Sequence, residues 1–302
     1  AKEGASVTLL ERYNHLGGLS TGGLVIWIDR MTDWQGQLVI RGFAEELFDR
    51  LPADAVAGPP LADWGSQDPA KAAHWSQRTA AYHGIVTWSP TLDPERLKLL
   101  SQEIVLERGV KLVYHAWAAE PITEHTTERI TERITERMTE RMTERTTEGG
   151  VADGVAGGVV KGVAFESKEG RMAILARVVI DATGDGDLFA RAGAAFDNDI
   201  EEADVHHCMN TSWLFAGVDM NRWIAFRAGQ PEAFAAFMAQ GRASCGLFER
   251  PFVSWRNDVA LFMGPRQTGY SALDVDDLSE VEVRSHRAME KHLAYYRANA
   301  PG

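Results

Sequence analysis

The stretch ARVVIDATGDGDLFARAGA, residues 176–194, decides the predicted fold. A continuous apolar run leads into Thr-Gly-Asp-Gly-Asp, and a short helical pattern follows. Such a run is typical of a strand buried in a parallel sheet. Glycines at the carboxyl end of that strand bring backbone amides to a phosphate or a flavin edge, and an acidic side chain there can hold a ribityl or ribose hydroxyl. The sequence therefore predicts a buried strand over 178–182 that enters a nucleotide-binding turn.

A calcium loop is the competing interpretation of the same turn. Asp181, Asp185 and Asp187 carry the oxygen ligands that Ca²⁺ prefers. Their spacing lacks the further acid that an EF-hand loop requires, so we discount this interpretation and predict no metal site.

A related segment opens the chain: GASVTLLERYNHLGGLSTGGLV, residues 4–25. It predicts a short buried strand that ends at Glu11 and runs into a glycine-rich loop. In a dinucleotide-binding fold, an acid at this place accepts hydrogen bonds from the adenosine ribose, and a glycine fingerprint precedes it by about 20 residues. For Glu11 that fingerprint would fall before residue 1. On this segment alone, a surface strand with a flexible loop is an equal alternative.

Three further helices are predicted: two lie between these motifs, and one lies near the end of the chain. Apolar residues recur at helical spacing over 39–51 and 279–299. In TLDPERLKLLSQEIVLERG, residues 91–109, Asp93 is the expected N-cap and Gly109 the expected end.

The middle of the chain predicts a strand, a repeat and a hairpin. Residues 110–122 alternate as a strand does, and a β-hairpin is expected to turn at 168–170. Between them, residues 126–148 repeat a Thr-Glu-Arg pattern every fourth position. A partner-binding helix is one interpretation of this repeat, but a solvated insertion without a function is the one we favour.

Composition narrows the class of protein. The 31 basic and 43 acidic residues give a formal net charge of −12, which repels nucleic acid and anionic membranes, so we expect neither as a partner. No apolar run reaches the length of a membrane span, and no signal peptide is recognised. Cys208 and Cys245 lie far apart in the sequence, so neither a zinc site nor a disulfide framework is expected. Two isolated cysteines fit a reducing compartment, and we expect a cytoplasmic location.

Four segments in order resemble the bacterial FAD-dependent oxidoreductases of the glutathione-reductase-like superfamily. They are GASVTLLERYNHLGGLSTGG, DPERLK, GVKLVYH and VVIDATGDGDLFARAGAAF. The resemblance spans most of the chain apart from the repeat, and the first and last segments are the specific ones. It departs at both ends, where the family's G-x-G-x-x-G turn and its C-terminal return to the flavin have no counterpart in these 302 residues.

The resemblance implies FAD as cofactor and gives roles to matching residues. Glu11 would bind the adenosine ribose with Arg12 beside it, and the strand around Ala118 would pass the adenine. The loop at 17–21 would lie near the pyrophosphate and flavin, and the turn at 184–187 would close over the ribityl chain and pyrophosphate. The implied cofactor-binding residues are Glu11, Arg12, Gly17, Gly18, Thr21, Ala118, Gly184, Asp185 and Asp187.

Candidates for catalysis come from short motifs outside these segments. His207 in VHHCMN would serve as a general base if it faced the flavin, although a structural role is the commoner one for a lone histidine. Arg266 in MGPRQTGY would hold a substrate carboxylate with its rigid guanidinium fork, and a surface arginine at a turn is the equal alternative. His83 in AYHGIV is a weaker candidate.

These observations predict an α/β fold: a Rossmann-like, three-layer FAD-binding domain with an inserted and appended α+β substrate region. Residues 1–30 and 90–195 would form the FAD-binding part, and 31–89 and 196–302 the substrate part. The predicted activity is hydride transfer between a small organic substrate and flavin N5. The alternative is a truncated or decayed flavoprotein that binds no FAD and acts at most as an interaction module. Because the glycine turn and return segment are absent, these 302 residues alone are expected to bind FAD weakly.

Overall fold

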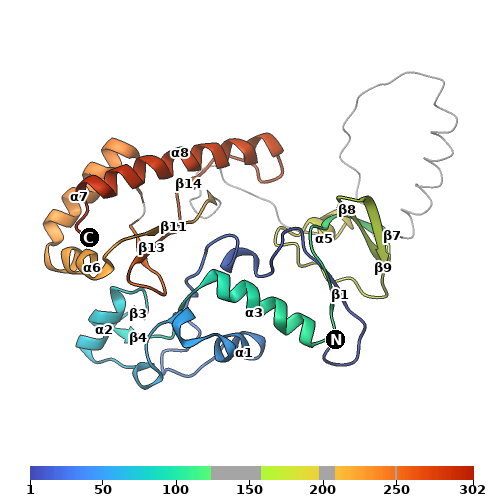
Figure 1. Cartoon of the computed structure of the whole chain (residues 1–302), viewed down its shortest axis with the longest axis horizontal. Coiled ribbons are helices and arrows are strands. Elements are labelled where there is room, and N and C mark those ends of the chain that lie inside the picture. Colours follow the sequence, from blue (N-terminus) through green and yellow to red (C-terminus); the bar gives the residue numbers. More distant parts are fainter. Residues whose placement is uncertain (124–157, 197–207, 249) are drawn as a thin grey trace. The chain divides into compact units, whose positions relative to one another are not determined.

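The structure is a computed structural model that describes residues 1–123, 158–196, 208–248 and 250–302 (Figure 1). The chain divides into two compact units, each built from two segments. Unit 1 comprises Ala1–Leu16 and Ile104–Asp199, and unit 2 comprises Gly17–Glu103 and Ile200–Gly302. Both units combine helices with strands, so the predicted α/β class is confirmed at this level. The repeat at 126–148 and His207 lie outside the described residues.

A parallel pair of short strands opens unit 1. Strand β1 (Thr8–Leu10) pairs with β6 (Lys111–Val113). Glu11 directly follows β1, as predicted, and its backbone amide donates to the carbonyl of Val113 at 2.9 Å. Parallel neighbours need a crossover connection, and this pair supplies the α/β character of the unit.

Helix α3 (Pro94–Glu107) leads into β6, and its ends are those that the sequence predicts. The carboxylate of Asp93 accepts from the amides of Glu95 at 2.9 Å and Arg96 at 3.3 Å, which satisfies two of the helix's first free donors. Gly109 has φ +68°, the left-handed conformation that closes many helices.

The rest of unit 1 contains a three-stranded antiparallel sheet in the order β7-β8-β9 (Figure 1). Its strands are β7 (Trp117–Thr123), β8 (Val160–Ser167) and β9 (Gly170–Leu175). The predicted hairpin between β8 and β9 is confirmed, with Gly170 at φ +106°. Val163 and Phe165, two residues apart on β8 and therefore on the same face of the sheet, are both buried.

The predicted buried strand at 178–182 is wrong. These residues form no strand, none of the described strands pairs with them, and Val178 and Ile180 are 75% and 84% exposed. An apolar run becomes a buried strand only where neighbouring strands satisfy its backbone and cover both faces. The described residues supply no such neighbours here. The helix that was predicted after the turn does form, as α5 (Asp187–Arg191).

The first half of unit 2 packs short elements around a small apolar cluster of Leu51, Ala55, Leu92 and Leu97. Strand pairs β2–β5 and β3–β4 are both antiparallel. Helix α1 starts at Phe43 rather than at residue 39, after Gly42 with φ +72°. The elements of this half, with 3-10 helices labelled η, are η1 (Gly18–Ser20), α1 (Phe43–Arg50), η2 (Ala53–Ala55), β2 (Val56–Ala57), η3 (Leu61–Asp63), α2 (Pro69–Ser76), β3 (Ala81–Tyr82), β4 (Ile85–Val86) and β5 (Thr91–Leu92).

The second half of unit 2 encloses an aromatic core between a small sheet and three helices. Trp223 packs edge-on against Phe237 and Tyr296, with ring centres 5.5 and 5.7 Å apart. Helix α8 begins at Val275, earlier than the predicted residue 279, because the Asp274 carboxylate caps its first amides. The elements are β10 (Met209–Asn210), β11 (Trp213–Ala216), α6 (Met220–Gly229), α7 (Pro231–Cys245), β12 (Phe252–Val253), β13 (Val259–Phe262), β14 (Arg266–Gln267) and α8 (Val275–Asn299).

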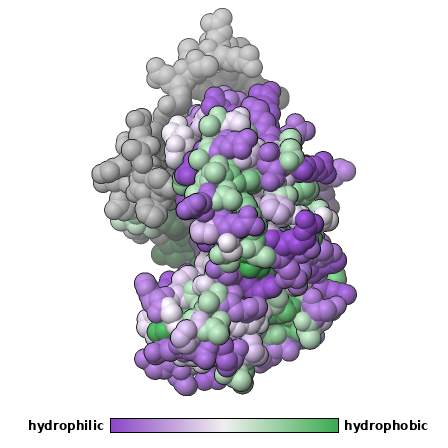
Figure 2. Space-filling model, turned by 90° about the vertical axis from the view of Figure 1, so that its left-hand side faces the viewer, coloured by the Kyte–Doolittle hydropathy of each residue, from purple (hydrophilic) through white to green (hydrophobic). Residues whose placement is uncertain are grey.

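The surface is largely hydrophilic on the face shown in Figure 2, with smaller hydrophobic areas between polar ones. None of the described helices combines the length and apolar character needed to span a membrane.

Candidate cofactor site

The Thr-Gly-Asp-Gly-Asp turn of unit 1 is held in shape by Asp181. One of its carboxylate oxygens accepts from the amide of Thr183 at 2.9 Å, and the other accepts from the amide of Phe189 at 2.8 Å. The hydroxyl of Thr183 in turn accepts from the amide of Asp187 at 3.0 Å. Burial acts to raise the pKa of Asp181, but these amide donors outweigh it and hold the pKa below its ordinary value. Asp181 is therefore an ionised clamp that fixes both ends of the turn.

The clamp leaves a run of three backbone donors without protein acceptors. In the part of the chain that the structure describes, the amides of Gly184, Asp185 and Gly186 donate to no protein group. Gly184 and Gly186 have φ +87° and +75°, which L side chains rarely adopt. A Cβ at Gly184 would meet no atom within 4 Å, so the turn is open on that side. Such amides suit phosphate or hydroxyl oxygens of a nucleotide.

Helix α5 connects this turn to strand β7. The guanidinium of Arg191 donates to the carbonyl of Ala119 on β7 and lies 3.8 Å from the carboxylate of Asp187. Asp187, predicted to contact the cofactor, therefore has Arg191 as a neighbour within the protein. Asp185 is exposed and points to no such partner among the described side chains.

Glu11 and Arg12 lie at the start of β7, and this start is close in the chain to the Ala119 carbonyl that Arg191 contacts. The Glu11 carbonyl accepts from the amide of Ala116 at 3.0 Å, and its carboxylate accepts from the amide of Tyr13 at 2.8 Å. The guanidinium of Arg12 lies over two aromatic rings, 4.7 Å from the ring centre of Tyr13 and 4.8 Å from that of Trp117. Both rings are about half exposed, so the three side chains present planar groups to solvent beside Ala118.

The sequence pattern of one protein family matches residues 1–302, and its description is FAD dependent oxidoreductase. The chain belongs to this family. None of the curated proteins matches it. Among solved structures, it is similar to Thermovibrio ammonificans THI4, with 11% identity over 63% of this chain and 53% of that one, and a TM-score of 0.29. The chain thus spans about half the length of that protein, and a TM-score this low says nothing about the fold.

The residues of this family member fit the cofactor that the family uses. FAD carries a pyrophosphate and two sugar-derived chains of hydroxyls, and unit 1 offers amide donors at 184–186 and a carboxylate acceptor at Glu11. No group of three or more His, Cys, Asp and Glu among the described residues is arranged to hold a metal ion. For the calcium alternative, the structure adds that both Asp181 oxygens are already engaged by amides.

Three predicted cofactor residues, Gly17, Gly18 and Thr21, belong to unit 2, whereas Glu11 belongs to unit 1. Gly17 has φ +99°, and a Cβ there would lie 2.6 Å from the Thr21 side chain, which is fully buried. The Thr21 hydroxyl donates to the carbonyl of Gly18 at 3.3 Å. The geometry shows a tight, glycine-dependent turn in which Thr21 has a structural contact.

The catalytic candidates are dispersed. Arg266 lies on β14, is exposed, and places its guanidinium 5.6 Å from the ring centre of Phe248. It lines a cavity of about 340 Å³ with His292, whose pKa is lowered chiefly by burial. His83 occupies the turn between β3 and β4, with φ +50° and its ring edge-on to Trp34 at 5.7 Å.

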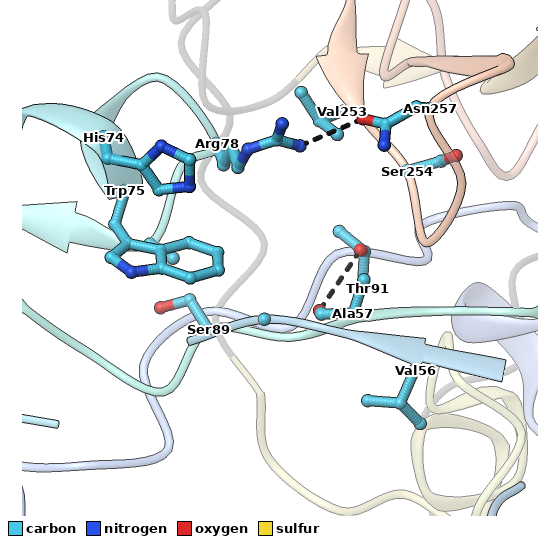
Figure 3. Close-up of a pocket in the computed structure, with 12 residues that line it drawn as sticks. Val56, Ala57, His74, Trp75, Arg78, Ser89, Thr91, Val253, Ser254 and Asn257 are labelled. Carbon is cyan, nitrogen blue, oxygen red and sulfur yellow. Dashed lines mark hydrogen bonds between the residues drawn. The ribbon is translucent and has the colours of Figure 1, made fainter. Parts of the chain in front are cut away.

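A second cavity in unit 2, of about 270 Å³, is lined by residues that the sequence analysis did not propose as functional (Figure 3). Arg78 and Asn257 meet at its rim through a hydrogen bond of 3.2 Å. These two residues are far apart in the chain, so no local motif signals them. Trp117 was missed for a related reason: its importance comes from stacking with Arg12, whereas the sequence shows only one aromatic residue in a strand.

Proposed function

We propose that the protein is an FAD-dependent oxidoreductase that transfers a hydride between a small organic substrate and the flavin. The family assignment supports the cofactor and the reaction class. The single structural observation that supports it best is the turn at 184–186, whose amides face no protein acceptor in the described residues while Asp181 fixes their geometry. Bound FAD supplies the hydride chemistry, which is its own, and the protein supplies binding, orientation and exclusion of water.

We assign the adenosine half of the cofactor to the end of β1. The Glu11 carboxylate accepts from a ribose hydroxyl while keeping its contact with the amide of Tyr13. The adenine lies against the layer of Arg12 and Trp117, beside Ala118, because exposed planar groups favour stacking with a heterocycle.

The pyrophosphate and ribityl oxygens receive hydrogen bonds from the amides at 184–186. Asp185, exposed at the tip of the turn, accepts from a ribityl hydroxyl, and Asp187 holds Arg191 against β7 as well as facing the cofactor. Gly17, Gly18 and Thr21 contribute a backbone surface for the flavin end. We also propose that the FAD-binding part of the chain adopts a Rossmann-like, three-layer arrangement.

For the substrate side, we retain Arg266 as a carboxylate-binding candidate and His207 as a general base. Arg266 is supported by its place on a cavity wall, and its stacking on Phe248 restricts the guanidinium. His207 directly precedes the described residue Cys208 and is supported by the sequence alone.

The test uses the protein purified without added flavin and then saturated with FAD. We expect yellow protein after gel filtration, release of FAD on denaturation, and bleaching of the flavin absorbance by an anaerobic reductant. The alternative function, an interaction module without FAD, predicts colourless protein at every step.

A further inference from the structure

Arg78 is a partly buried cation whose protein partners are neutral. It follows helix α2, and its guanidinium donates to two neutral amide oxygens: Nη1 donates to Oδ1 of Asn257 at 3.2 Å, and Nη2 donates to Oδ1 of Asn221 at 3.1 Å. Among the described residues, no carboxylate lies within ion-pair distance of Arg78. Burial lowers the pKa of Arg78, which shows that the charge is partly withdrawn from water without compensation.

The guanidinium has donors to spare. An arginine carries five N–H groups in one plane, and the two asparagine side chains each accept one bond, from Nη1 and from Nη2. Amide oxygens hold the group in position without neutralising it. Such an arrangement differs from the exposed pair Arg256–Asp258, where two bonds of 2.8 and 2.6 Å use the same fork on a carboxylate.

The cavity beside Arg78 is lined by this one arginine together with both polar and apolar side chains. Figure 3 shows the Arg78 side chain running toward Asn257, with Trp75, Ser89, Thr91 and Val56 around the space below. The hydroxyl of Thr91 is turned to the carbonyl of Ala57 at 3.4 Å. At about 270 Å³, the cavity exceeds the roughly 150 Å³ that holds a benzene molecule in a protein core.

We propose that this cavity binds a small organic monocarboxylate, with the carboxylate paired to Arg78 and the apolar body against Trp75 and Val56. The planar Arg78 guanidinium matches the two oxygens of a carboxylate. The carboxylate supplies the negative charge that the partly buried guanidinium lacks. All residues of the site belong to unit 2, so the proposal stands independently of flavin binding.

A monocarboxylate fits better than a phosphate ester. A phosphate dianion would leave a second negative charge inside walls that offer a single arginine, and His74 beside it has a lowered pKa, first through burial and then through the charge of Arg78. His74 therefore favours its neutral form and does not supply the second positive charge.

The test is calorimetric titration of the purified protein with benzoate, benzamide and phenyl phosphate. We expect benzoate to bind and benzamide, its neutral analogue, to bind at least about tenfold more weakly. Arg78→Gln is expected to weaken benzoate binding by roughly 10- to 100-fold, and Arg78→Lys by less. Ala57→Leu, which fills the cavity without touching the guanidinium, is expected to weaken it as well.

A matched variant controls for the loss of a positive charge. Arg284→Gln removes an equal charge from α8, where Arg284 pairs with Glu280. It is expected to bind benzoate as the unaltered protein does, with circular dichroism confirming that all variants fold. The proposal is overturned by absent benzoate binding, by equal binding of benzamide, by tighter binding of phenyl phosphate, or by an equal loss of benzoate binding in Arg78→Gln and Arg284→Gln. If Arg78→Gln does not fold, Arg78→Lys and Ala57→Leu decide the matter by the same comparison.

Discussion

The carboxylate of Asp181 reaches across the glycine turn to the amide of Phe189, with Oδ2 and the nitrogen 2.8 Å apart. The same carboxylate accepts from the amide of Thr183, so one side chain closes a loop over residues 181–189. The turn therefore keeps its shape through a residue that need not touch the cofactor itself.

Replacing Asp181 by Ala should lower the free energy of unfolding by about 1–3 kcal/mol, because hydrogen bonds to a charged acceptor are lost and two amides lose their partner. Urea unfolding measures the change. Asp185→Ala is the matched control: its exposed side chain does not hold the turn, so its stability should stay within about 0.5 kcal/mol of the unaltered protein. Equal losses in both variants would show that Asp181 is not the clamp.

The contribution of Asp181 to the free energy of unfolding should depend on pH. Its folded-state pKa lies below the ordinary Asp value, because the donated amide bonds outweigh the opposing effect of burial. The stability that it contributes is therefore fully present above the ordinary pKa of about 3.9 and is lost as pH falls through the lower folded-state value. The difference in unfolding free energy between the unaltered protein and Asp181→Asn should shrink over that acidic range. If this difference in unfolding free energy grew as pH falls, the lowered folded-state pKa of Asp181 would be contradicted.

The sequence predicted the elements that local chemistry determines. Asp93 and Gly109 define α3 because capping acts within a few residues, and Gly170 fixes the β8–β9 turn in the same way. The run at 178–182 was misjudged because burial depends on neighbours that the run itself does not encode. Likewise the Arg12–Trp117 stack and the Arg78–Asn257 pair join distant segments, and only the folded chain shows them.

The aromatic core of unit 2 should depend strongly on Phe237. It is 6% exposed and contacts Trp223, Tyr295 and Tyr296, so Phe237→Ala should cost about 3–5 kcal/mol of unfolding free energy. Thermal or urea unfolding measures it, with Phe248→Ala as control because Phe248 is 59% exposed. A small loss at Phe237, similar to that at Phe248, would contradict the packing described for α6, α7 and α8.

The repeat should be dispensable for stability. Thr123 and Val160 face each other in the β7–β8 register, so the strands that flank the repeat can be joined by a short turn. Replacing residues 124–159 with Gly-Asn, which suits a tight hairpin turn, should leave the free energy of unfolding equal or higher, since a shorter loop has less entropy to lose. A loss of more than about 2 kcal/mol on urea unfolding would show that the segment stabilises the protein.

The most direct measurement is the FAD affinity of the protein, determined by quenching of flavin fluorescence for the unaltered protein, Glu11→Gln and Glu120→Gln. Glu11→Gln keeps the oxygen that accepts from Tyr13 but loses the charge that we assign to the ribose. Glu120, exposed on β7 and paired with Arg171 at 3.4 Å, is the control from the same unit. We predict roughly 10- to 100-fold weaker binding for Glu11→Gln and unchanged binding for Glu120→Gln. Equal affinities in all three proteins, or no binding by the unaltered one, would contradict the cofactor site proposed at the end of β1.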